Sequence, residues 1–118
     1  MADYTFRNVL DARQTIRDNE LVLSTALRIM VRCPKAEVAW VCIRGVIRAK
    51  PGTGAKFEVV PTYLRDKRTA VWIMRVDGKE FTYGGVEEPP LEIAAQLDAR
   101  GYTIRPWAAQ TRWPWRLL

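Results

Sequence analysis

The sequence predicts an α+β fold in a single domain that spans residues 1–118. Its length is close to the commonest domain size, and 48% hydrophobic with 27% charged residues is an ordinary globular balance. Apolar residues recur at helical spacing near both ends, whereas the middle alternates between apolar and polar positions. We therefore expect an N-terminal helical segment, a mainly antiparallel sheet of four to five strands, and one C-terminal helix followed by an edge strand and a Trp/Arg-rich tail.

Residues 6–17 are expected to form an amphipathic helix. Phe6, Val9 and Ile16 follow helical spacing, and Thr5 stands in front of them as a cap. The polar residues that follow end this helix.

Residues 21–32 allow two interpretations. Asp18 and Asn19 before them are a good N-cap and Pro34 after them is a stop, which favours a second helix. The stretch 27–32 also alternates in the way of a strand, so the assignment stays open.

The pattern changes to strands after this segment. Asp77-Gly78 is a strong hairpin signal, Pro61 indicates an edge strand or a bulge, and Gly45 indicates a bulge or a close backbone approach. The expected strands cover residues 38–48, 57–64, 69–76 and 79–83. In the first strand one face is expected to hold Ala39, Val41, Ile43 and Ile47, and the other Trp40, Cys42, Arg44, Val46 and Arg48.

A C-terminal helix is expected over residues 91–100. Acidic residues and the pair Pro89-Pro90 stand before it, and Gly101 follows it, as is typical of helix ends. Residues 102–107 then have the pattern of an edge strand.

The charge of the chain is unevenly distributed. The net charge is +6, and residues 38–79 alone hold nine basic and three acidic side chains, whereas residues 80–101 hold one basic and five acidic ones. A basic block of this kind indicates contact with a polyanion or an acidic protein, or else is a solvated face without a partner. Its expected centre is Arg44, Arg48, Arg65, Lys67 and Arg68.

Several classes of chemistry are excluded or disfavoured. The chain has no histidine, which removes His-based triads, His general bases and His metal ligands. Cys33 and Cys42 are too few for a zinc site, and residues 52–56 lack the spacing of a phosphate-binding loop. We expect no metal and no cofactor. No apolar run is long enough to span a membrane, and the N-terminus does not resemble a signal peptide, so we expect a cytoplasmic protein.

The first candidate binding surface is the aromatic and basic face of the sheet. Exposed aromatic rings stack on nucleic-acid bases while cations hold the phosphates. The alternative, which is favoured, is that Trp40 and Trp72 are core residues, with arginines over the rim. The candidate residues are Trp40, Arg44, Arg48, Lys50, Lys56, Arg65, Lys67 and Arg68.

The second candidate surface is the tail, residues 107–118, which holds three of the five tryptophans. Trp and Arg are the residues most enriched in binding hot spots. We expect the tail to fold back, with Trp107 or Trp113 packed on the domain body. Arg112, Trp113 and Trp115 are the candidates for contact with a partner or, in a homodimer, with a second copy of the chain.

These features favour a small non-catalytic docking protein that inhibits or adapts a protein or a protein–nucleic-acid complex. In size and general character the chain resembles the anti-CRISPR proteins that phages and mobile elements make against host defence. The alternative is a nucleic-acid-binding module that uses residues 38–79. A third interpretation is a histidine-free ribonuclease, since size and charge also resemble ribosome-dependent toxins of the RelE type. For that activity the raw material would be Arg44, Arg65, Arg75, Tyr63 and Tyr83.

Overall fold

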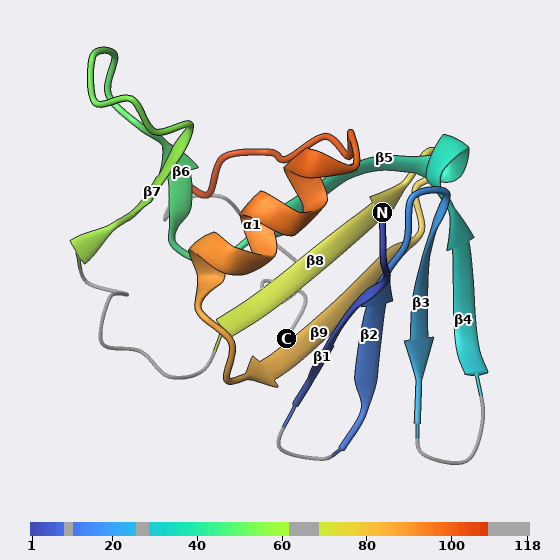
Figure 1. The fold of residues 1–118 in the computed structure, drawn as a ribbon. Coiled ribbons are helices and arrows are strands. Elements are labelled where there is room, and N and C mark those ends of the chain that lie inside the picture. The colour runs from blue at the N-terminus through green and yellow to red at the C-terminus, as the bar shows by residue number, and fades with distance from the viewer. Residues whose placement is uncertain (9–10, 26–28, 62–68, 109–118) are drawn as a thin grey trace.

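The structure, a computed structural model, describes residues 1–8, 11–25, 29–61 and 69–108. In this part of the chain, antiparallel strands form three sheets, and the helix α1 (Pro90–Ala99) packs against them (Figure 1). The α+β class is therefore confirmed in its broad form. No helix among the described residues is long and apolar enough to cross a membrane.

The first sheet is a meander of four strands in chain order. Its strands are β1 (Tyr4–Arg7), β2 (Arg13–Ile16), β3 (Glu20–Ser24) and β4 (Ile29–Pro34). Each strand pairs antiparallel with the next, and inward side chains such as Phe6, Ile16 and Leu21 alternate with polar ones that face outward.

The expected N-terminal helix over 6–17 is wrong. Phe6 and Ile16, which seemed to share a helical face, lie on two short strands, and the chain turns between them at Asp11, whose φ is +60°. The helical interpretation of residues 21–32 is also wrong, because residues 21–24 lie in β3 and residues 29–32 lie in β4. The strand alternative, which was given for residues 27–32, is correct for 29–32, and the strand at 21–24 was not predicted.

The second sheet has the order β5-β8-β9, and a separate two-stranded ribbon lies beside α1. The strands of the second sheet are β5 (Val38–Ile43), β8 (Thr69–Arg75) and β9 (Glu80–Val86), and those of the ribbon are β6 (Val46–Arg48) and β7 (Phe57–Val59). The short 3-10 helix η1 (Lys35–Glu37) connects β4 to β5. The hairpin expected at Asp77-Gly78 is confirmed between β8 and β9.

Gly45 divides the strand that was expected over 38–48. It has a φ of +80° in a turn, and its carbonyl accepts a hydrogen bond from Val60 N at 2.8 Å. The turn changes which side chains share a face: Val46 joins the main core, and Ile47 packs on the opposite side of the second sheet. The expected alternation beyond Ile43 is therefore wrong.

The main core lies between α1, the first sheet and the second sheet. It is built from fully buried apolar side chains that these elements direct toward one another, including Phe6, Ile16, Leu21, Val41, Ile43, Val71, Ile73, Ile93 and Leu97. Tyr83 belongs to the same core and meets Phe6 edge to face, with ring centroids 5.6 Å apart.

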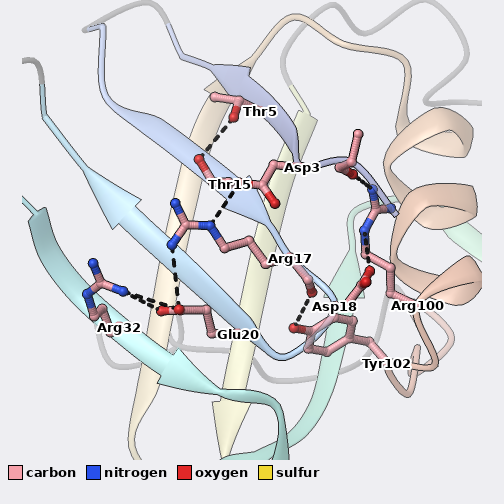
Figure 2. A network of polar contacts seen from close by, with 10 residues as sticks. Asp3, Thr5, Thr15, Arg17, Asp18, Glu20, Arg32, Arg100 and Tyr102 are labelled. Atoms are coloured by element: carbon pink, nitrogen blue, oxygen red, sulfur yellow. Dashed lines mark hydrogen bonds and ion pairs between the residues drawn. The ribbon is translucent and has the colours of Figure 1, made fainter.

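A polar network ties the end of α1 to the first sheet (Figure 2). Arg100, whose side chain is only 3% exposed, donates to the Ala2 and Gln96 carbonyls and lies 3.7 Å from the Asp18 carboxylate. Tyr102 donates to the Arg17 carbonyl at 2.8 Å. These contacts hold the segment after α1 in place before it reaches the second sheet.

The expected edge strand over 102–107 is present only as a short parallel contact with β5. Ile104 forms a single bridge to Val41, whose N donates to Thr103 O and whose carbonyl accepts from Arg105 N, both at 2.8 Å. Pro106 follows and has no N–H to extend the ladder. The segment therefore covers the edge of β5 only locally.

Candidate docking surface

A second, smaller cluster lies on the side of β5 and β8 that faces away from the main core. Cys42, Trp72 and Trp107 are its buried members, and Ile47 packs against them. Trp72 stands opposite Cys42 in the ladder, and its indole stacks on Trp107 with centroids 5.3 Å apart and planes 14° from parallel. Three segments distant in the sequence thus share one indole-lined cluster.

Trp40 lies at the solvent boundary of this cluster. It is half-buried, and the guanidinium of the exposed Arg105 lies 5.0 Å from its ring centroid. A guanidinium above an indole face is attracted by the ring quadrupole. Because Arg105 N is bonded to Val41 O, the backbone holds this cation over the ring.

The surrounding side chains define one exposed area, which we call the Trp40 surface. The ladder places Met74 opposite Trp40, and Glu80 opposite Met74, so these three share a face of the second sheet. Thr82, opposite Trp72, lies on the same face and is exposed. The Trp40 surface consists of Trp40, Met74, Glu80, Thr82 and Arg105. It combines a half-exposed aromatic ring with a fixed cation.

Only part of the predicted aromatic and basic face is assembled. Trp72 is a core residue at 6% exposure, whereas Trp40 packs against the smaller cluster and is only partly buried. Arg44 lies in the turn after β5, with its N bonded to Ala70 O. Arg48 is exposed but belongs to β6, where it pairs with Phe57. The structure thus places neither arginine on the strand that carries Trp40.

The remaining predicted residues fall on the loop between β6 and β7 or outside the described part of the chain. Lys50 and Lys56 are exposed on that loop, which joins two strands and precedes no helix, unlike a phosphate-binding loop. Lys56 Nζ bonds to the Asp98 carboxylate at 2.9 and 3.0 Å. Outside the described residues lie Arg65, Lys67, Arg68, Arg112, Trp113 and Trp115, together with the expected homodimer contact through the tail.

Carboxylates from outside the block, Asp98 and Glu37, and one inside it, Asp77, pair with two of its cations. Besides the Lys56–Asp98 pair, Arg75 lies 3.6 Å from Glu37 and 3.3 Å from Asp77. Residues 38–79 therefore present less free positive charge in the folded protein than their composition indicates.

Three of the described side chains that could act as nucleophiles or acids are buried: Cys33, Cys42 and Tyr83. Tyr63 and Arg65, also named for the ribonuclease interpretation, lie outside the described residues. Burial raises the pKa of the Cys42 thiol to about 12 and raises the pKa of Cys33. Tyr83, named for the ribonuclease interpretation, donates its hydroxyl hydrogen to the Ala12 carbonyl, and burial raises its pKa to about 12. Among the described residues, no three Asp, Glu or Cys side chains are grouped so that they could hold a metal ion.

Arg105 was missed by the sequence analysis. The available signal was its spacing from Trp107, because residues two apart in an extended segment point to the same side. Trp107 or Trp113 was expected to pack on the domain body, and Trp107, at 8% exposure, does so. No protein-family model and no curated protein matches the chain, so the role of the Trp40 surface is argued from its geometry.

Proposed function

We propose that this chain is a non-catalytic docking protein that binds a protein partner through the Trp40 surface. The observation that carries the proposal is the Trp40–Arg105 pair, in which a partly exposed indole lies beneath a cation at 5.0 Å. Trp and Arg are enriched among the few residues that dominate interface energetics. The pair therefore has the composition of a hot spot.

The base of the surface supports this role because it is rigid. Trp40 packs on the cluster that holds the Trp72–Trp107 stack, and Trp107 N bonds to Val46 O at 2.8 Å. A side chain that is already ordered loses little conformational entropy on binding.

The partner surface that fits best presents an apolar group beside a carboxylate. The apolar group would pack on the Trp40 ring, and the carboxylate would meet the guanidinium of Arg105 in a charge-assisted hydrogen bond. A protein that binds a partner without catalysing a reaction acts by blocking that partner or by linking it to another molecule. We therefore propose an inhibitor or an adaptor. Arg112, Trp113 and Trp115, which lie outside the described residues, stay candidates for contact with the partner.

The test compares matched variants for capture of partners from an extract of the source cells. The wild type, Trp40→Ala/Arg105→Ala and the control Arg32→Ala/Leu91→Ala are immobilised, and bound proteins are quantified by mass spectrometry. The control removes one exposed apolar side chain and one cation elsewhere on the molecule. We expect a defined protein that the wild type and the control retain and the Trp40 variant loses. Equal retention by all three folded proteins would contradict the proposal.

The nucleic-acid alternative through residues 38–79 stays a hypothesis. Of the cations that the structure describes in this range, Lys56 and Arg75 are in ion pairs, which weakens the case for this block as the main polyanion contact. Arg7 and Arg13, on the β1–β2 hairpin, are better candidates for contact with phosphates.

A further inference from the structure

The β1–β2 hairpin places two arginines directly opposite each other. Arg7 pairs with Arg13, and Arg13 pairs in turn with Ser24 on β3, so the three residues form one row across three strands. The neighbouring row, Phe6 and Gln14, is buried in the core. Because side chains alternate along a strand, the row of Arg7, Arg13 and Ser24 faces outward.

The two arginines of this row have fewer or longer carboxylate contacts than Arg17 and Arg32, the other arginines described in this part of the fold. Arg17 bonds to Asp3 at 2.9 Å and lies 3.5 Å from Glu20, and Arg32 bonds to Glu20 at 2.8 Å (Figure 2). Arg7 and Arg13 have fewer such contacts.

The carboxylate that pairs with Arg7 is that of Asp11, at 3.7 Å, and both side chains are more than half exposed. Arg13 forms no ion pair with any described residue, and its buried Nε has no hydrogen-bond partner there. The register therefore sets two arginines opposite each other, and the one described carboxylate in ion-pair contact with them is that of Asp11, on Arg7.

Such an arrangement is unfavourable unless an anion bridges the two cations. Like charges directly opposite in a sheet are destabilising, and the Cβ atoms of such a pair are about 5 Å apart. At that separation one phosphate group can accept hydrogen bonds from both guanidinium forks. The hydroxyl of Ser24, next in the row, adds a third donor.

We propose that Arg7, Arg13 and Ser24 form a phosphate-binding row that contacts the sugar–phosphate backbone of a nucleic acid. The row lies on the side of the sheet that faces away from the main core, and its two cations are complementary in charge to a polyanion, on which several phosphate contacts act together. This surface is separate from residues 38–79 and does not depend on the Trp40 surface.

The experiment measures binding of a fluorescent single-stranded oligonucleotide by anisotropy over a salt series. For the wild type we expect log affinity to fall linearly with log salt concentration. Arg7→Gln/Arg13→Gln should reduce the magnitude of this slope by about 0.7 for each phosphate contact that is lost. The control Arg17→Gln/Arg32→Gln removes the same charge from two arginines of the first sheet region that are in ion pairs, and it should keep the wild-type slope.

Two results would overturn the proposal: an equal loss of slope in the control, or no binding by the wild type at low salt. Far-UV circular dichroism checks that each variant is folded. If the double variant does not fold, the wild-type NMR signals of the arginine Nε–H groups decide. Oligonucleotide should shift those of Arg7 and Arg13 more than that of Arg32, and a uniform shift would count against the row.

Discussion

Trp72 and Trp107 stack with their ring centroids 5.3 Å apart, although one lies in β8 and the other follows α1. This contact fixes the segment after the helix on the outer side of the second sheet. It also determines where Arg105 lies. Arg105 precedes Trp107 by two residues, and its backbone N–H is bonded to the Val41 carbonyl. The Trp40–Arg105 pair is thus a consequence of core packing.

Substitution of the stacked tryptophans should destabilise the fold. Trp107→Ala removes a buried indole, and such truncations lower the free energy of unfolding by about 3–5 kcal/mol. Trp40→Ala should cost clearly less, because its ring is only half-buried. Urea denaturation followed by far-UV circular dichroism measures both. Equal losses for the two variants would show that Trp107 is not a core residue.

Stability should fall at high pH. Burial raises the pKa of Tyr102 from 10.0 to about 12, so its neutral form favours the folded state. That contribution is fully present below pH 10 and is lost as the pH rises from 10 to 12. Tyr102→Phe, which also loses the hydrogen bond to Arg17 O, should be less stable at pH 7 but should show a flatter decline between pH 10 and 12. An unchanged decline in thermal melts at these pH values would refute this assignment.

Both cysteines should be unreactive in the folded protein. Cys33 and Cys42 are buried, and burial raises the pKa of each thiol, so little thiolate is accessible at neutral pH. A thiol-specific chromogenic reagent should label them only at the rate at which the protein opens. Rapid labelling of a native sample at pH 7 would be inconsistent with this packing.

Gln14 should be a site where an apolar substitution stabilises the protein. Its side chain is 1% exposed, and neither its amide oxygen nor its nitrogen has a hydrogen-bond partner among the described residues. An unsatisfied buried amide costs about 1–3 kcal/mol. Gln14→Leu should therefore raise the midpoint of denaturation, whereas Gln14→Glu, which buries a charge, should lower it. A loss of stability in Gln14→Leu would indicate that an internal water satisfies the amide.

The elements with local signals were the ones that could be predicted. Helix α1 has Pro90 at its start and Gly101, with a φ of +81°, after its end, and it forms where expected. The β8–β9 hairpin likewise follows from Asp77-Gly78. The β1–β2 turn has neither Gly nor Pro among residues 8–12, so no local signal marks it. The apolar residues of the two four-residue strands therefore had the spacing expected of one helix face.

The candidate site was predictable only in part. Trp40 was found because an aromatic residue in a strand beside arginines is a local pattern. Its partner Arg105 reaches it through a parallel contact with β5, which depends on how α1 returns the chain to the sheet. Arg7 and Arg13 were missed because a helix does not place them side by side, whereas the observed hairpin does.

The central claim is that the Trp40–Arg105 pair is the anchor of a protein interface. The most direct test is calorimetric titration of the captured partner into the wild type and into Trp40→Ala, with folding of each checked beforehand. A hot-spot residue contributes at least about 2 kcal/mol, so the variant should bind about 30-fold more weakly or worse. Affinities within about twofold of each other would show that the partner binds elsewhere and would contradict the account.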